Sequence, residues 1–319
     1  MNIREQIEQR EHQNLSPYAK KADESLGREQ KIEEDSMRTC FMRDSDRIVH
    51  SHVFRREKDK SQVFILPENA HIMNRLTHTL EVTQVAKSIA IALNLNESLT
   101  EAIALGHDTA HTCFGHTGES VLNRLSPYGY NHAKAAYRRL NVLCNLNLTK
   151  EVLDGIVNHS GVKNTPVAMT LEGQICPFAD KIAYLPSDIE NAIWVGIIKD
   201  IPERFQKSLG KNKSQIMKTL IHALVETSYD QPAIKMDESV FKEFVALRQF
   251  CFEEIYKSPI LLEEKHKGEI IVEYFYHYFK KYPWKIPDYT EDMDVEQAVI
   301  DYIAGMTDRY AMDLFTKFI

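Results

Sequence analysis

The sequence predicts an all-α protein: one large helical domain with a charged arm before it and a helical extension after it. Apolar residues recur at intervals of three and four along several segments, which is the spacing of a buried helix face. Residues with good capping side chains precede these segments. No alternating run of apolar and polar residues is long enough to indicate a substantial sheet.

The chain divides into three parts. Residues 1–36 are highly charged and predict an arm that is only partly ordered. Residues 37–200 carry the clearest helical patterns and a cluster of histidines, so we expect them to form the core of the site. Residues 201–319 continue as helices that pack on this core, with loops marked by Pro232, Pro259, Pro283 and Pro287.

Composition excludes several classes of protein. The net charge of −7 argues against a general nucleic-acid coat, which needs an excess of Lys and Arg to neutralise phosphates. The five cysteines are scattered and include no CxxC pair, so we expect reduced thiols. The first residues lack the apolar centre of a signal peptide, and no apolar run is long enough to span a membrane. We therefore expect a cytoplasmic protein.

The first informative helix is predicted from Leu76 to Leu93. Val82, Val85 and Ile89 form its apolar stripe. His78 lies one turn before Val82 on the same stripe and is expected to face inward. A lone inward histidine is more often a hydrogen-bonded core residue than a metal ligand, so this position alone does not indicate a metal.

A second helix is predicted after a short break. Ser98 and Glu101 have the spacing of a capping box. His107 lies on the apolar stripe of this helix and should face inward too. Together with Asp108 beside it and His78 on the preceding helix, it offers nitrogen and oxygen ligands that suit a first-row divalent ion.

Further histidines follow the second helix. Six of the thirteen histidines lie within residues 71–132, which indicates a site. His116 lies three residues before Glu119, close enough to pair in a helical turn. A carboxylate that binds one imidazole nitrogen fixes the tautomer and supports the charged ring, as proton transfer requires. The alternative is a surface pair at a helix start. His132 is expected to open the next helix.

The segment of residues 171–192 combines a core stripe with a row of polar side chains. The stripe consists of Ile175, Phe178, Ile182, Leu185 and Ile189. On another face, Asp180, Tyr184 and Asp188 follow one another at intervals of four, with Lys181 alongside. Asp180 could supply a last metal ligand, while the other two line a cavity. The alternative is a solvated polar face.

The places of Arg75 and His159 in predicted helices suggest a role for each. Arg75 lies three residues before His78, so its guanidinium emerges beside the metal and could bind a phosphate through two parallel bonds. A structural ion pair is the alternative. His159 is interpreted as structural, because a histidine in a last helical turn suits the helix dipole.

These residues lie in motifs that resemble those of the HD-domain metallohydrolases. Within them, the chain is similar to the deoxyguanosine triphosphate triphosphohydrolase family of bacteria, which includes a vertebrate deoxynucleotide-depleting relative. The motifs are LSPYAKKADESLGR, RDSDRIVHSHVFRR, SQVF, NRLTHTLEV, LTEAIALGHDTAHTCFGHTGE, LNLTKEVLDGIVNH, ADKIAYLPSDIENA and DYIAGMTDRYA. The resemblance covers nearly the whole chain.

The resemblance implies a helical hydrolase that splits a deoxynucleoside triphosphate into deoxynucleoside and tripolyphosphate. It implies one divalent metal ion (Mn, Mg, Fe, Ni or Zn), whose ligands are His78, His107, Asp108 and Asp180. The implied catalytic residues are His116 and Glu119, with His111 and His132 near the phosphates. The implied substrate contacts are Arg75 and Lys181 for phosphate, and Tyr184, Asp188 and Gln62 for deoxyribose. The family also tends to form homo-oligomers, and a deoxynucleotide effector or single-stranded DNA stays open as a further partner.

The chemistry of that reaction calls for a general acid. A divalent ion held by two imidazoles and two carboxylates activates water and polarises phosphorus. Attack at the α phosphorus expels a 5′-alkoxide, which must be protonated as it leaves. His116, held by Glu119, is the residue that we expect to protonate it.

The chain departs from the family pattern beside two of these histidines. Thr109 and Ala110 replace a Leu-Gly pair, and Cys113 replaces a proline. Residues 133–136, Ala-Lys-Ala-Ala, follow His132 where an Asn or Glu and a Gln are usual. Every expected metal ligand is nevertheless present.

Two other functions remain open from the sequence. Another HD-type hydrolase could act on a nucleoside monophosphate or a cyclic nucleotide, and it would keep the metal ligands without needing to bind β and γ phosphates. A nucleotide sensor or nucleic-acid-binding protein without catalytic activity would bind nucleotides and release no product.

Overall fold

The computed structural model describes residues 1–65, 71–161 and 167–318. Within these ranges it contains fifteen α-helices and no β-strand, and its β-type pairings are two isolated bridges, Arg28 with Thr149 and Ser61 with Asn74. The predicted all-α class is confirmed. No helix in the described ranges combines the length and the apolar character needed to cross a bilayer.

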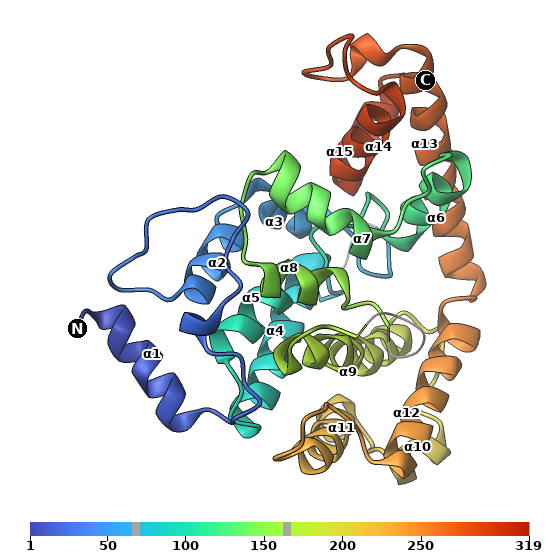
Figure 1. The fold of residues 1–319 in the computed structure, drawn as a ribbon. Helices are drawn as coiled ribbons and strands as arrows, with labels where there is room; N and C mark the ends of the chain where they lie inside the picture. Colours follow the sequence, from blue (N-terminus) through green and yellow to red (C-terminus); the bar gives the residue numbers. More distant parts are fainter. Residues whose placement is uncertain (66–70, 162–166, 319) are drawn as a thin grey trace.

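Four helices form the centre of the molecule (Figure 1). They are α4 (Arg75–Ala92), α5 (Glu97–Gly106), α8 (Lys150–Val157) and α9 (Leu171–Trp194). The predicted first helix agrees with α4 to within one residue at each end. The stripe predicted on α9 faces the core, where its fully buried members are Ile175, Ile182, Leu185 and Ile189. Phe178, the remaining member, is half-buried against the same cluster.

The start of α5 differs from the prediction. Asn96, not Ser98, caps this helix, and its side-chain oxygen accepts a hydrogen bond from the Leu99 amide at 3.2 Å. The capping box expected from Ser98 and Glu101 was therefore wrong. Glu172 holds Asn96 in place from outside the helix, because its Oε1 accepts the Asn96 amide at 2.9 Å. The helix therefore begins after Asn96, two residues before Ser98.

The apolar core has three clusters. The first joins α4 and α9 to α10 (Glu203–Ser208), α11 (Lys213–Ser228) and α12 (Glu238–Phe250). The second joins α5 and α8 to α2 (Cys40–Val49), α3 (His52–Arg56) and α7 (His132–Tyr137). The third joins α6 (His116–Leu125), α13 (Pro259–Lys281), α14 (Val295–Gly305) and α15 (Asp308–Thr316). The end of the chain thus packs on the central helices through α10–α12 and on α6 through α13–α15.

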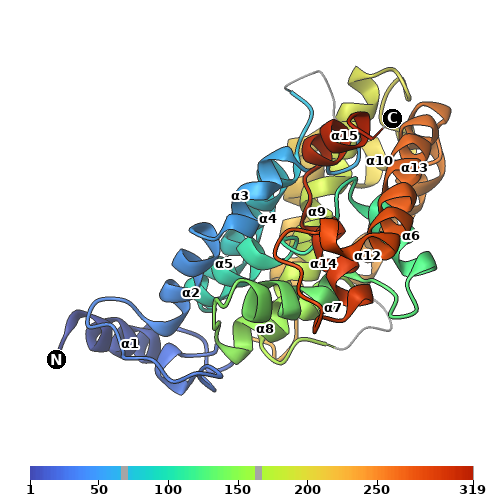
Figure 2. The same cartoon turned by 90° about the horizontal axis from the view of Figure 1, so that it is seen from above.

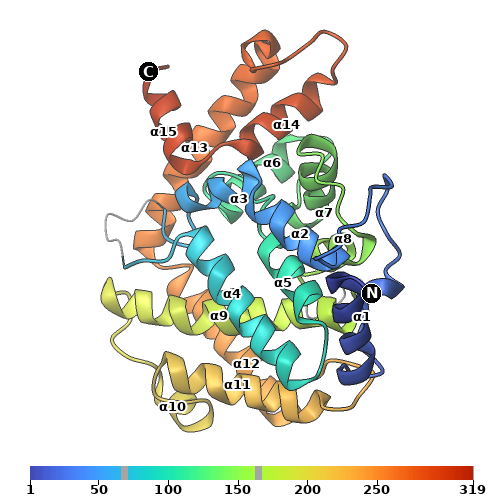
Figure 3. The same ribbon diagram turned by 90° about the vertical axis from the view of Figure 1, so that its left-hand side faces the viewer.

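One stretch of chain connects the first cluster to the third. From α12 it passes through the π-helical turn η4 (Cys251–Ile255) into α13, along one side of the molecule (Figures 1 and 3). This brings side chains of α12, η4 and α13 opposite α9. The remaining short helical turns are η1 (Ala22–Glu24), η2 (Glu57–Asp59), η3 (Arg138–Leu143) and η5 (Pro283–Lys285).

The charged arm is tied to the core by hydrogen bonds. It contains α1 (Ile3–Asn14), which lies at the edge of the molecule (Figure 2). The Lys20 amide donates to Glu172 Oε1 at 3.0 Å. Arg28 binds the buried carboxylate of Asp44, and its guanidinium also donates to the Asn147 carbonyl at 2.7 Å. These contacts fix the arm beside α2 and α9.

Candidate active site

Four predicted metal ligands meet where α4, the end of α5 and α9 approach one another. His78 and His107 are fully buried. His78 Nε2 lies 3.2 Å from Asp180 Oδ1 and 3.7 Å from Asp108 Oδ2. His107 Nε2 lies 3.5 Å from Asp108 Oδ1. The ligand atoms of His78, His107 and Asp108 lie within 4.8 Å of one another, and the Asp180 carboxylate lies beside His78.

Three ring nitrogens of His78 and His107 have no hydrogen-bond partner among the described residues. His107 Nδ1 lies 2.7 Å from the Ala104 carbonyl and must donate to it, so Nε2 carries the lone pair. Nε2 of His107 and both ring nitrogens of His78 lack hydrogen-bond partners within the described residues. Such buried polar atoms are rare unless something else binds them. Imidazole nitrogens with carboxylate oxygens fit a first-row divalent ion.

The charges of these groups also suit a cation. Burial keeps the pKa of His107 below its ordinary value, so the ring is neutral. Burial opposes the ionisation of Asp180, but Lys181, 3.5 Å away, and His78 outweigh it and hold the pKa of Asp180 well below the usual range. Both aspartates of the cluster are thus carboxylates, since the pKa of Asp108 is lowered by His107 and Arg75 despite its burial.

Arg75 lies behind the cluster. Its side chain is 1% exposed, binds Asp108, and donates to the Ser61 carbonyl at 2.9 Å. It is not among the residues that line the adjoining cavity. Of the two interpretations left open by the sequence, the structure contains the ion pair, and Arg75 holds Asp108 in place.

A second group of histidines lies beside the metal cluster, centred on Glu119. His116 Nδ1 lies 2.9 Å from Glu119 Oε2, so the pair expected from the sequence spacing is present. Glu119 Oε1 lies 3.0 Å from His132 Nδ1 and accepts the His132 amide at 2.9 Å. The ring of His111 stacks on that of His132, with centroids 3.7 Å apart.

Glu119 is therefore an anion that holds two imidazoles. Burial alone would raise the pKa of Glu119, but hydrogen bonds with His116 and His132 lower it well below its usual value. The side chain of His116 is 75% exposed, so its ring extends into solvent while Glu119 holds it at Nδ1. A ring held at Nδ1 by a carboxylate can carry a proton on Nε2 and deliver it.

His159 lines the same cavity, although the sequence analysis interpreted it as structural. Its Nδ1 lies 2.6 Å from the Ile156 carbonyl, and its Nε2 lies 3.3 Å from His132 Nε2 and 3.9 Å from Asp108 Oδ1. Burial and the neighbouring histidines lower its pKa to about 3. His159 therefore adds a neutral nitrogen to the cluster. Its place at a helix end does not predict this position.

A cavity of about 600 Å³ opens from these two groups of side chains. The end nearest the metal ligands is lined by Asp108, His111, His116, His132, Asp180 and Lys181. Farther along α9 and on the elements opposite it, the lining includes Tyr184, Asp188, Arg248, Tyr256 and Lys265, which we call the far end. Gln62 lines the cavity from the loop beside Gly115. This volume is in the usual range for small-molecule sites. The polar row predicted on α9 therefore faces a cavity, not solvent.

The far end of the cavity contains a carboxyl group with a raised pKa. The hydroxyl of Tyr256 donates to Asp188 Oδ2 at 2.6 Å. Burial raises the pKa of Asp188 to about 7, although the bond from Tyr256 acts in the opposite direction. Arg248 on α12 lies beside Tyr184. Arg248, Tyr256 and Lys265 were missed by the sequence analysis, because helices far along the chain bring them here.

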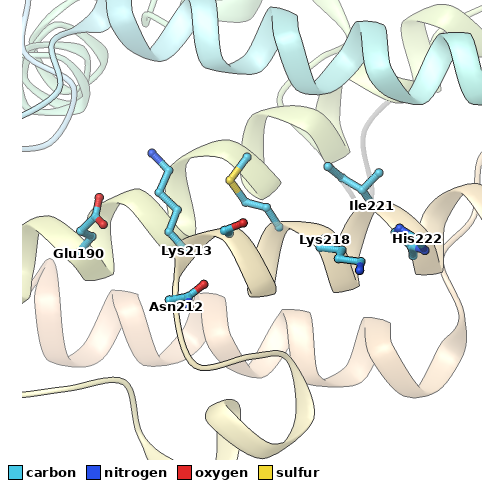
Figure 4. Close-up of a pocket in the computed structure, with 8 residues that line it drawn as sticks. Glu190, Asn212, Lys213, Lys218, Ile221 and His222 are labelled. Atoms are coloured by element: carbon cyan, nitrogen blue, oxygen red, sulfur yellow. The ribbon is translucent and has the colours of Figure 1, made fainter.

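A larger hollow lies elsewhere, along the side of α11 next to α9 (Figure 4). Its volume is about 740 Å³, and it is lined by Glu190 from α9 and by side chains such as Lys213 and His222. Lys213 is already paired with Glu81 at 2.9 Å. Because this hollow is open surface without a group of converging ligands, we place the site in the smaller cavity.

Comparison with known proteins places this geometry in a family. Residues 75–185 match the HD domain, and residues 234–317 match the phosphohydrolase-associated domain. A deoxyguanosinetriphosphate triphosphohydrolase-like protein of Clostridium perfringens (strain SM101 / Type A) is 45% identical, over 99% of this chain and 97% of that protein. The chain belongs to the deoxyguanosinetriphosphate triphosphohydrolase-like family of HD-domain proteins.

Other members of this family match over a similar length. The protein of the same name from Caldanaerobacter subterraneus subsp. tengcongensis is 45% identical, over 98% of this chain and 94% of its own. That of Clostridium tetani is 40% identical, over 99% and 96%. A solved structure of a hypothetical protein from Aquifex aeolicus shares the fold, with a TM-score of 0.52 at 17% identity over 86% of this chain and 68% of its own.

Family membership and the buried ligands agree on the general class of the protein. HD domains bind divalent metals, and the groups of residues able to hold one include His78 with His107 and Asp108, and Asp108 with His132 and His159. The protein is accordingly a metal-dependent nucleotide phosphohydrolase in its general class.

Proposed function

We propose that this protein hydrolyses deoxynucleoside triphosphates to deoxynucleosides and tripolyphosphate. One observation carries the proposal: a single cavity has metal ligands and a carboxylate-held histidine at one end, and a tyrosine bonded to an aspartate of raised pKa at the other. The first end suits a phosphate ester and the second a sugar. The names of the family members support the same substrate class.

The metal would be held by His78, His107, Asp108 and Asp180. When bound, a divalent ion in this group supplies an activated water and withdraws charge from the phosphoryl group. The residues around it complete the reaction. Hydrolysis at the α phosphorus breaks the bond to the 5′ oxygen, and this oxygen must gain a proton. His116 is in position to donate it from Nε2, while Glu119 stabilises the charged ring beforehand.

Positive charge along the cavity suits a triphosphate. Lys181 lies next to the metal ligands, with its ammonium 3.5 Å from Asp180 Oδ2. Arg248 and Lys265 line the cavity from α12 and α13. His111 and His132 add ring nitrogens at the metal end. Cations and donors fixed in advance stabilise the charge that develops on the phosphates during the reaction. Arg75 contributes indirectly, by holding Asp108.

The far end supports recognition of a deoxyribose. A protonated Asp188 and the hydroxyl of Tyr256 can both exchange hydrogen bonds with a sugar hydroxyl. Tyr184 offers its ring as a wall against the 2′ carbon, where a ribose would place a further hydroxyl. Gln62 Oε1 is buried without a hydrogen-bond partner within the described residues, so it can accept one from the substrate.

The proposal is tested by product analysis. The purified protein is incubated with Mn²⁺ and each deoxynucleoside triphosphate in turn, with the ribonucleotides as controls, and the products are separated by chromatography. We expect deoxynucleoside and tripolyphosphate in equal amounts, with little action on ribonucleotides. Cleavage confined to monophosphates or cyclic nucleotides would overturn the proposal in favour of another phosphohydrolase. Binding of deoxynucleotides without any product would indicate a sensor.

Two parts of the prediction from family resemblance continue as proposals. We expect the chain to assemble into homo-oligomers, and we expect any deoxynucleotide effector or single-stranded DNA to bind outside the cavity. Light scattering of the purified protein, with and without nucleotides, measures the first. The net charge of −7 restricts DNA binding to a local basic patch.

A further inference from the structure

The link between α14 and α15 lies against the loops that carry the site residues. We call residues 304–308 the elbow; they fall within the motif DYIAGMTDRYA, to which the proposed function gives no role. The α14–α15 pair lies close to α3 in two views (Figures 2 and 3). Residues from the end of the chain are thus brought to the histidine cluster.

Asp308 connects two of these loops. Its side chain is fully buried. Oδ1 accepts the Phe114 amide at 2.8 Å, and Oδ2 accepts the Ser61 amide at 2.9 Å and also the Ser61 hydroxyl. Ser61 precedes Gln62 of the cavity wall, and Phe114 precedes His116 by two residues. One carboxylate therefore fixes the backbone on both sides of the site.

The turn held by Asp308 is strained. Phe114 has φ +59°, a left-handed conformation that a bulky aromatic residue rarely adopts. Such a residue persists only where its surroundings hold it. Gly115 follows with φ +54°, where an added Cβ would lie 2.9 Å from Arg75 Nη2. The helix that begins at His116 therefore starts from a backbone that would not keep this shape alone.

The elbow is itself anchored by donors from two elements. Lys60 Nζ, in the loop after η2, donates to the Ala304 carbonyl at 3.0 Å and also to the carbonyl of His111. Arg56 of α3 donates to the Gly305 carbonyl at 3.0 Å. Just before the elbow, Arg139 of η3 donates to the Asp301 carbonyl at 2.9 Å. The last carbonyls of a helix lack partners within the helix, so these bonds make the elbow a firm support.

We propose that Asp308 is a positioning residue for the proton-donating histidine. By binding the Phe114 amide it holds the strained turn from which α6 starts, and so it aims the ring of His116 at the cavity. Asp308 touches neither substrate nor metal. The role rests on the proposed function only in the step that His116 performs, because the placement of the His116 ring can be measured without any reaction.

The test compares Asp308→Asn with Asp313→Asn, an exposed change on the same helix. The amide keeps the shape of Asp308 but replaces one acceptor oxygen by a donor that faces the Phe114 or Ser61 amide. Nuclear magnetic resonance of the His116 imidazole reports the placement of the ring. We expect its signals to shift in Asp308→Asn and to stay unchanged in Asp313→Asn, while bound metal stays at the wild-type level in both.

Turnover provides the second measurement. We expect kcat for deoxynucleoside triphosphates to fall by roughly 10- to 100-fold in Asp308→Asn with KM nearly unchanged, the range that a small misplacement of a reacting group produces. In a His116→Ala background the same change should have no further effect, because the residue acts through His116. A purely structural role would give additive losses or loss of metal.

The outcomes separate the inference from the proposed function. If the wild type releases no tripolyphosphate but the His116 signals shift as expected, the proposed function fails and the positioning role stands. Unchanged His116 signals in a folded Asp308→Asn overturn the role, as do additive losses in the double variant. If Asp308→Asn does not fold, Ser61→Ala removes a single donor to the same carboxylate. That variant must then shift the His116 signals, and unchanged signals overturn the role.

Discussion

Two aspartates on one helix differ in almost every physical respect. Asp180 and Asp188 lie two turns apart on α9, and both face the cavity. Asp180 lies 3.2 Å from His78 Nε2 beside an ammonium, and its pKa is held far below the ordinary range. Asp188 accepts a hydrogen bond from the Tyr256 hydroxyl, and burial raises its pKa to about 7. The same type of side chain is a carboxylate at one end and binds a proton far more readily at the other.

This difference assigns chemistry to the two ends of the cavity. At the metal end, buried lone pairs of His78 and His107 have no donor, so the end is incomplete without a cation. At the far end, Asp188 already has the Tyr256 hydroxyl as a partner, and the cationic side chains of Arg248 and Lys265 line the same part of the cavity. We therefore expect the first end to bind a metal ion, and the far end to bind hydroxyl groups and the phosphate oxygens that its cations attract.

The largest expected effect comes from exchanging the two aspartates for asparagine one at a time. In Asp180→Asn we expect loss of bound metal together with loss of turnover. The loss of metal affinity should exceed the ~10–100-fold that follows removal of a residue that only hydrogen-bonds to a ligand. In Asp188→Asn we expect full metal content. Elemental analysis of the purified proteins measures both. Full metal occupancy in Asp180→Asn would contradict the ligand group.

The second-largest effect is expected from His116, the proposed general acid. In His116→Ala we expect metal content to survive and turnover to fall ~10²–10⁴-fold, the usual contribution of a general acid. His222→Ala, a change of an exposed histidine on α11, is the control and should leave both unchanged. If His116→Ala turned over at the wild-type rate, His116 would have no place in the mechanism.

A smaller effect is expected at the far end. Tyr256→Phe removes the hydroxyl that donates to Asp188 and leaves the metal ligands untouched. We expect KM to rise by roughly five-fold, equivalent to one lost hydrogen bond of about 1 kcal/mol, with kcat nearly unchanged. Steady-state kinetics with the preferred deoxynucleotide measures the split. A fall in kcat at constant KM would place Tyr256 in the chemical step instead.

The smallest effect is a dependence of stability on pH. Because the pKa of Asp188 is raised by folding to about 7, the folded protein binds this proton more tightly than the unfolded chain. Asp188 therefore contributes stability below an ordinary carboxyl pKa of about 4, and this contribution is lost as pH rises through about 7. Its titrating neighbours are Tyr256, His78, Asp180 and Glu81.

Thermal unfolding at a series of pH values measures this contribution. We expect the wild type to lose stability between about pH 4 and pH 7 relative to Asp188→Asn, in which the group does not titrate. Parallel curves for the two proteins would show that Asp188 is ionised in the fold.

The metal end could be predicted because it is encoded locally. His78 and His107 lie on the apolar stripes of α4 and α5, and the interval of four residues puts Asp180 on one face with Tyr184 and Asp188. A helix converts such spacing into direction without knowledge of the rest of the fold. The structure brings these side chains together as the spacing predicts.

The rest of the site depends on contacts between segments distant in sequence. Arg248, Tyr256 and Lys265 reach the cavity only because α12, η4 and α13 pass opposite α9, and no local pattern marks them among ordinary surface residues. The partner of Arg75 and the place of His159 follow from packing in the same way. The cap of α5 was wrong because Glu172, far along the chain, holds Asn96.

The central claim is that water attacks the α phosphorus and that the bond to the 5′ oxygen breaks. Hydrolysis in water labelled with heavy oxygen, followed by mass spectrometry of both products, tests it most directly. The account predicts one labelled oxygen in tripolyphosphate and none in the deoxynucleoside. Label in the deoxynucleoside, or release of orthophosphate or pyrophosphate in place of tripolyphosphate, would contradict it.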